Sequence, residues 1–71
     1  MLTKELIRKM VQEDINALLR ILEKNIKHAN DNLLLIEKGE MTAEYMEEEI
    51  EVINESQSMV NLIQEVINER S

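Results

Sequence analysis

The sequence Lys38-Gly39-Glu40-Met41-Thr42 is the one stretch of this 71-residue chain that has the composition of a turn. Gly39 is the only glycine, and it suits the left-handed residue that commonly follows a helix end. Thr42 suits a helix N-cap, because its hydroxyl can accept a hydrogen bond from a free amide one turn later. Met41 before this cap and Met46 inside the next helix are spaced as a hydrophobic staple. The stretch therefore predicts that one helix ends near residue 38 and that another begins near residue 43.

On both sides of this turn the chain consists of good helix formers, without proline and without the alternating pattern of strands. Thr3 provides a second N-cap at the start, with Leu2 and Ile7 as its staple. We therefore predict an all-α fold of two helices, at about 4–38 and 43–69. Because the connection is short, the helices are expected to be antiparallel. At this length the chain can form one domain, which we place at residues 1–71.

One apolar stripe runs along the whole first helix with a mean step of about 3.6 residues, which is the helical repeat. It consists of Ile7, Val11, Ile15, Leu18, Leu22, Ile26, Ala29, Leu33 and Ile36. The segment Asn30-Asp31-Asn32 contains poor helix formers and could break this helix. However, the stripe crosses that segment without a change of phase, which predicts one unbroken helix.

Each predicted helix also carries a second apolar band, about 100° from the first. In the first helix this band consists of Leu6, Met10, Ala17, Ile21, His28 and Leu35. In the second helix the seam that closes the hairpin is predicted to consist of Met46, Ile50, Ile53, Gln57, Val60, Gln64 and Ile67, and the second band of Tyr45, Val52, Met59, Ile63 and Val66. The two second bands are displaced in the same rotational sense, so in an antiparallel pair they lie on the same side.

Together, the second bands predict an interface with another chain. Left in water, they would expose about 600–800 Å² of apolar surface, more than the largest patch of an ordinary monomer, about 300–600 Å². A two-fold dimer that forms a four-helix bundle would cover this surface. The predicted dimer interface consists of Leu6, Met10, Ala17, Ile21, His28, Leu35, Val52, Met59, Ile63 and Val66. An unrelated protein could cover it instead.

The charge is strongly asymmetric: residues 1–30 carry a net charge of +2 and residues 31–71 a net charge of −9. Most of the acidic residues fall on one outward side of the second helix. A carboxylate face of this kind usually keeps a protein soluble, and it could also dock a basic protein surface by imitating nucleic-acid phosphates. The candidate docking residues are Glu44, Glu47, Glu48, Glu51 and Glu55.

The sequence contains few of the residues and motifs that catalysis or cofactor binding requires. The chain has no cysteine, and its single histidine, His28, follows Asn25 rather than the glutamate of a Glu-x-x-His metal motif. One glycine cannot form a phosphate-binding loop. The basic residues of the first helix are interleaved with acidic ones and lack stacking aromatics, which argues against nucleic-acid binding. We therefore expect no enzyme activity, no metal and no cofactor.

The sequence does not name a specific role. It predicts a small interaction or regulatory protein that acts through protein–protein contacts as a homodimeric hairpin. The alternatives are an acidic inhibitor of a nucleic-acid-binding protein and a monomeric hairpin that serves as an adaptor or subunit of a larger complex. A cytoplasmic location is expected, because no apolar run is long enough to span a membrane and the N-terminal segment is too charged for a signal peptide. Balanced charge and missing aromatic anchors argue against a membrane-surface helix at residues 1–22.

Overall fold

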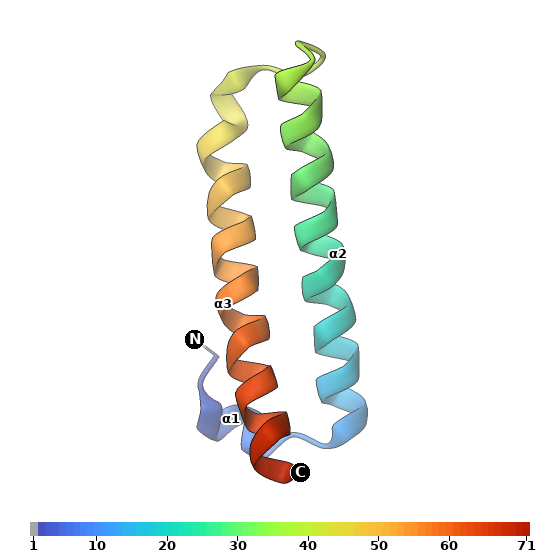
Figure 1. Ribbon diagram of the computed structural model, residues 1–71, viewed down its shortest axis with the longest axis vertical. Coiled ribbons are helices and arrows are strands. Elements are labelled where there is room, and N and C mark those ends of the chain that lie inside the picture. Colours follow the sequence, from blue (N-terminus) through green and yellow to red (C-terminus); the bar gives the residue numbers. More distant parts are fainter. Residues whose placement is uncertain (1) are drawn as a thin grey trace.

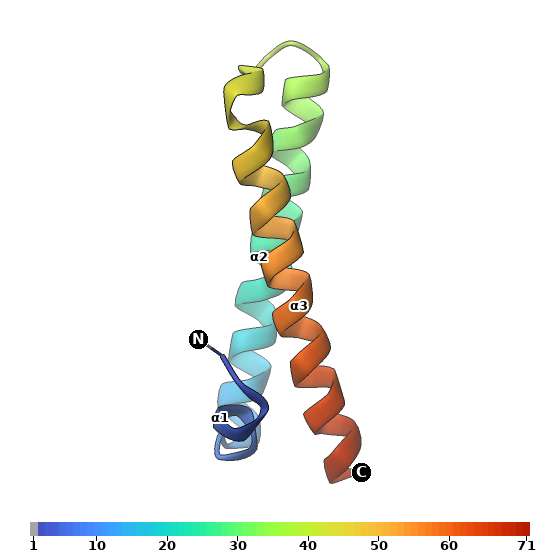
Figure 2. The ribbon, with the colours of Figure 1, turned by 90° about the vertical axis from the view of Figure 1, so that its left-hand side faces the viewer.

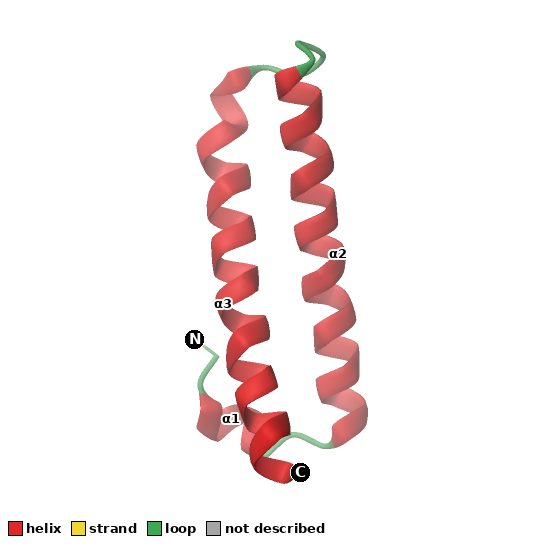
Figure 3. Ribbon diagram, in the orientation of Figure 1, coloured by secondary structure: helices red, strands yellow, loops and turns green. Residues whose placement is uncertain are grey.

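A computed structural model of the protein describes residues 2–71 and consists of helices (Figures 1 and 3). The elements are α1 (Lys4–Arg8), α2 (Gln12–Glu37), the single 3₁₀ turn η1 (Ala43–Tyr45) and α3 (Met46–Arg70). The long helices α2 and α3 pack antiparallel as a hairpin, with Cα extents of 45 × 18 × 16 Å. No strand occurs in the described residues. The prediction of an all-α helical hairpin is thus confirmed.

The turn between the long helices follows the predicted chemistry at its first half. Gly39 adopts a φ of 79°, and its N–H donates to the carbonyl oxygen of Ile36 over 3.1 Å. The N–H of Glu40 donates to the carbonyl oxygen of Leu35 over 2.9 Å. These two bonds form a Schellman motif, which satisfies carbonyls that the end of α2 leaves free. The second half differs, because Thr42 makes no side-chain capping bond and η1 precedes the start of α3.

The first helix is broken at its beginning, where we predicted one helix over residues 4–38. Thr3 caps α1 as expected, with its hydroxyl oxygen 3.3 Å from the N–H of Leu6. The helix then stops at Lys9, and α2 starts after Val11, which has extended backbone angles and no side-chain capping bond. No residue in this segment is a helix breaker. Tertiary contacts of α1 therefore set this bend. The Asn30–Asn32 segment lies within α2, so the expected continuity there is confirmed.

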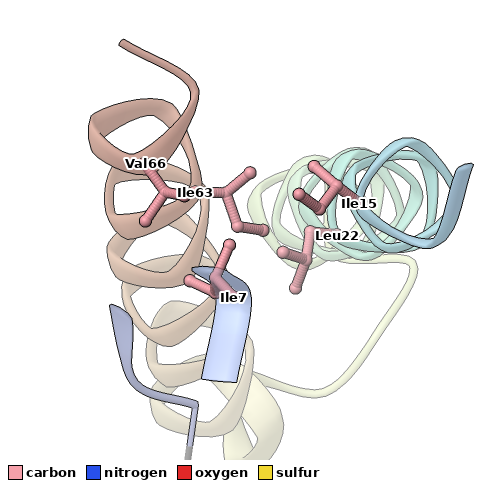
Figure 4. Close-up of a cluster of buried hydrophobic side chains, with 5 residues drawn as sticks. All are labelled: Ile7, Ile15, Leu22, Ile63 and Val66. Carbon is pink, nitrogen blue, oxygen red and sulfur yellow. The ribbon is translucent and has the colours of Figure 1, made fainter. Parts of the chain in front are cut away.

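The core lies where α1, α2 and α3 meet (Figure 4). Ile7 projects from α1 between the two long helices and is fully buried. In α2 the predicted stripe is buried at every seventh residue, at Ile15, Leu22, Ala29 and Ile36. Val11 belongs to the same stripe but is 62% exposed, because the chain bends at this residue.

The prediction of which residues of the second helix face the first is wrong in part. Ile53, Val60 and Ile67 of the predicted seam are half-buried, and Val60 and Ile67 pack against the core. The line of α3 that faces α2, however, runs through half-buried Glu49 and buried Ser56, which lie between the two predicted bands, and then through fully buried Ile63 of the predicted second band. Met46 and Ile50, assigned to the closing seam, are instead 41% and 43% exposed. The two predicted bands are the two flanks of one seam. Their similar hydrophobicity concealed the polar residues that lie between them.

Candidate interaction surfaces

The hairpin has two long faces, one on each side of the seam between α2 and α3. We call the face on which α1 packs the α1 face, and the opposite one the open face. Figure 2 shows α1 to one side of the C-terminal half of α3. On α3 the residues that share a hollow or an ion pair with the N-terminal segment have helical spacing and therefore lie on one side: Glu55, Ser58, Met59, Leu62, Glu65 and Glu69.

The lower half of the α1 face is the half away from the turn between α2 and α3, at the bottom of Figure 1, and the upper half is the half next to that turn. In its lower half, the α1 face is covered by α1. The ammonium of Lys4 lies 2.7 Å from Oε2 of Glu65. The guanidinium of Arg8 makes a two-pronged contact with Glu69, through Nη2 at 2.8 Å from Oε1 and Nε at 3.1 Å from Oε2. These pairs are half-exposed, so they orient α1 more than they stabilise it. Beneath them, the apolar contacts of Ile7 provide most of the attachment.

The Arg8–Glu69 pair shifts the ionisation of both of its members. The hydrogen bond from Arg8, followed by their mutual attraction, holds the pKa of Glu69 below its ordinary value. The same hydrogen bond raises the pKa of Arg8. Both groups therefore stay charged over the whole physiological range of pH.

A second attachment joins the end of α3 to the end of α1. Nη2 of Arg70 donates to the main-chain oxygens of Ile7, Arg8 and Met10, over 3.2, 2.9 and 3.0 Å. These carbonyls belong to the end of α1 and the bend after it, where a helix leaves acceptors short of internal partners; the oxygen of Ile7 also accepts from the N–H of Met10 over 3.0 Å. Arg70 thus acts as a C-terminal cap supplied by a distant part of the chain.

In its upper half, the α1 face is uncovered. Ile21, His28 and Leu35 follow one another every seventh residue along α2, opposite Val52 and Tyr45 of α3. Ile21 is 56% exposed and Tyr45 is 45% exposed. The groove between these rows is polar, because a hollow of about 330 Å³ is lined by Asn25, His28, Ala29, Asn32, Glu49 and Val52. Within it, Nδ2 of Asn32 donates to Oε1 of Glu49 over 3.2 Å.

The residues predicted for the dimer interface are thus placed in different surroundings. Exposed on the upper α1 face are Ile21, His28, Leu35 and Val52. Met10 and Met59 are half-buried beside the core. Leu6 in α1 and Ala17 near the start of α2 are exposed. Ile63 and Val66 are fully buried inside the single chain. The expectation that these two face outward is wrong, because Ile7 of α1 packs over them.

The open face was not recognised from the sequence. Its centre is an apolar strip made of side chains that the hairpin leaves half-buried: Leu19, Ile26, Leu33, Ile53, Val60 and Ile67. Met46 and Ile50 extend the strip at its upper end. On α3 its border consists of Ile50, Gln57 and Gln64. These residues directly follow Glu49, Ser56 and Ile63, which face α2. The signal that could have revealed it is Leu19, which continues the line of Ile26 and Leu33 at seven-residue spacing.

The acidic residues of η1 and α3 divide into two groups. Glu65 and Glu69 pair with α1, and Glu49 accepts from Asn32. The predicted docking residues are all exposed and make no ion pair within residues 2–71: Glu44, Glu47, Glu48, Glu51 and Glu55. Like charges four residues apart repel and weaken a helix slightly. This group is therefore a concentrated negative surface that the chain itself does not neutralise.

Within residues 2–71, no three His, Asp or Glu side chains lie close enough together to hold a metal ion. None of the helices in these residues has both the length and the apolar composition needed to cross a bilayer. Comparisons with protein families, with curated proteins and with solved structures found no match. The surfaces described above are thus the basis for assigning a function.

Proposed function

We propose that this chain is a small, non-enzymatic protein–protein interaction module that works as a homodimer of helical hairpins. The observation that carries the proposal is a count of side chains in residues 2–71. Nine large apolar side chains are 37–62% exposed, whereas seven hydrophobic residues are buried. A single hairpin of two long helices does not have enough inward-facing positions to bury the rest.

The energetics favour association with another surface. Burying a fully exposed large aliphatic side chain contributes about 1.5–3 kcal/mol, and about half of that when it is already half-buried, so the exposed side chains of two copies must act together to offset an association cost of about 4–15 kcal/mol. A second hairpin is the simplest complement, since two such units form a four-helix bundle and most soluble oligomers are symmetric. The bundle would then present its polar outer surfaces, including the carboxylates of α3, to a further partner.

Sedimentation equilibrium of the purified chain, over a concentration range around the micromolar, tests the proposal. We expect a mass close to twice that of the 8.3 kDa chain, with dissociation on dilution. A folded chain that stays monomeric throughout this range would contradict the dimer. It would favour the alternative of a monomeric hairpin that docks into a larger complex.

The unpaired carboxylates favour a second candidate, an acidic inhibitor that occupies the basic site of a nucleic-acid-binding protein. The test replaces Glu44, Glu48, Glu51 and Glu55 by lysine and compares the proteins captured from source cells by variant and wild type. The control variant reverses Glu13 and Glu23 of α2. A nucleic-acid-binding protein that is lost only with the α3 variant, while the oligomeric state is unchanged, would support this candidate. Equal capture by both variants would eliminate it.

A further inference from the structure

We infer that the surface covered by the second copy is the open face, and not the α1 face that the sequence pattern indicates. The inference rests on the proposed self-association and specifies which side of the hairpin makes it. Of the exposed apolar side chains, this interface covers Met46 and Ile50 together with the half-buried strip, and it leaves those of the upper α1 face to a further partner. Three observations carry the inference: what already covers each face, the charge along α3, and the size of the face.

The α1 face is already occupied over half of its length. Ile7 packs between α2 and α3 at the end of the hairpin away from the turn, and Arg70 fixes the end of α1 in that position. The other half of this face has a polar centre, with Asn32 hydrogen-bonded to Glu49. A second hairpin laid on this face would have to displace α1 or bury these polar groups, and both changes are costly.

The open face has neither obstacle. The ion pairs of α1 lie on the opposite face, and Leu19, Ile26 and Leu33 run along the open face opposite Val60, Ile53 and Met46. Each of these side chains is partly covered by the hairpin, so little further ordering is needed to bury the remainder. A layered apolar strip of this kind is what the centre of a four-helix bundle requires.

The charge along α3 favours the open face for a partner that is a second copy. The chain carries a net charge of −7, and self-association brings like charges together. On α3 the border of the α1 face contains Glu48, Glu55 and Glu69, of which Glu69 is paired with Arg8, whereas the border of the open face contains Ile50, Gln57 and Gln64, which are all neutral. On α2 the open face is bordered by Glu23, Asn30 and Glu37, each four residues after a residue of the apolar strip. Two copies therefore approach each other with least repulsion where their α3 helices meet.

The size of the open face also fits a second copy. Between its outermost Cα atoms the chain is 45 Å long and 18 Å wide, so a long face has a projected outline of about 800 Å², of the same order as the accessible surface of about 800 Å² that each partner buries in an interface of standard size. A short peptide or a single helix would leave part of the strip uncovered. A second hairpin has the same length and width, and therefore covers all of it.

The two residues that flank buried Ser56 in the sequence, Glu55 and Gln57, provide a matched test. Gln57 is on the open-face border and Glu55 on the α1-face border, and both are exposed. Because the chain has no cysteine, Gln57→Cys and Glu55→Cys each create one site for a nitroxide label. Pulsed electron paramagnetic resonance then measures the distance between the two labels of a dimer. We expect a clearly shorter distance for the label at 57 than for the label at 55.

Two substitutions of exposed residues complete the experiment. Ile50→Glu places a charge on the open face and Ile21→Glu places one on the upper α1 face; the residues are 43% and 56% exposed, so both variants should fold, which circular dichroism checks. We expect Ile50→Glu to weaken dimerisation about tenfold or more, and Ile21→Glu to leave it nearly unchanged. The opposite ranking, or a shorter distance at 55, would overturn the inference and leave the dimer standing. A monomeric wild type would instead refute the proposed self-association itself.

Discussion

Arg70 and Arg8 meet at the open end of the hairpin, where Nη2 of Arg70 donates to the main-chain oxygen of Arg8 over 2.9 Å. The same nitrogen also reaches the carbonyls of Ile7 and Met10. The end of α3 thereby caps a helix near the other end of the sequence. Because α1 has only five residues, it has little stability of its own and depends on such contacts.

We expect Arg70→Ala to destabilise the docked position of α1 by about 1 kcal/mol, because the charge-assisted hydrogen bonds of the two Nη2 hydrogens, which are shared among three carbonyls, are replaced by bonds to water at an exposed site. Arg70→Lys should lose part of this stabilisation, since its ammonium stands on a shorter side chain than the one that carries Nη2. Hydrogen exchange of the α1 amides measures the change. Arg20→Ala, on the outside of α2, is the control. Unchanged exchange in Arg70→Ala would show that the cap does not hold α1.

Ile7 and its neighbour Leu6 provide a second comparison, because Ile7 is fully buried and Leu6 is 51% exposed. Ile7→Ala leaves a cavity against Ile63 and Val66 and should cost about 2 kcal/mol, at the lower end for such changes because α1 can detach as a unit. Leu6→Ala should cost about 0.5 kcal/mol or less. Urea unfolding measures both. Equal losses would contradict the placement of Ile7 in the core.

The ion pair of Arg8 and Glu69 should make the docking of α1 depend on pH in acid. Its hydrogen bond lowers the pKa of Glu69 in the folded chain, so the pair contributes stability above the unfolded pKa of about 4.3 and loses it as the pH falls through the lower folded value. We therefore expect wild type to be more stable than Glu69→Gln at neutral pH, with the difference vanishing in acid once the carboxyl group is protonated in the folded chain as well. Denaturant midpoints at several pH values measure this difference. If it persisted in acid, the pair would not be its cause.

Local sequence rules were sufficient for the existence of the long helices and for the first half of the turn between them. The seven-residue spacing of Ile15, Leu22, Ala29 and Ile36 determines which side of α2 is buried, and Gly39 marks its end through a conformation that other residues adopt with difficulty. These features depend on neighbours within a few residues, which the sequence displays directly.

The bend at Lys9–Val11 and the seam of α3 depend on distant residues and were not predicted. The bend places Ile7 against Ile63 and Val66 of α3, and no local signal marks it. In α3 the seam passes through Glu49 and Ser56, whose polarity hides its position. Both errors bear on the predicted interface, because it included Ile63 and Val66, which are buried within the single chain.

The bend itself can be strengthened. Val11 occupies the N-cap position of α2 with extended backbone angles, makes no capping bond, and is 62% exposed. Val11→Ser supplies a hydroxyl that can accept from a free amide of the first turn, so it should stabilise the protein by about 0.5–1 kcal/mol. Val11→Ala provides no acceptor and should give no gain. Thermal unfolding separates the two variants. If serine destabilised the protein relative to alanine, residue 11 would lie inside a continuous helix, as the sequence alone predicts.

Gly39 offers the corresponding test at the other end of α2. A Cβ added there meets nothing within 4 Å, so any cost of Gly39→Ala comes from the backbone conformation, with φ at 79°. An alanine in this left-handed region should lower stability by about 1–2 kcal/mol. Gly39→Asn should lose less, because asparagine tolerates that region better. Comparing the unfolding free energies of the two variants isolates the conformational effect from packing. An alanine variant as stable as wild type would mean that the turn adopts a different geometry, without the hydrogen bonds that now close the end of α2.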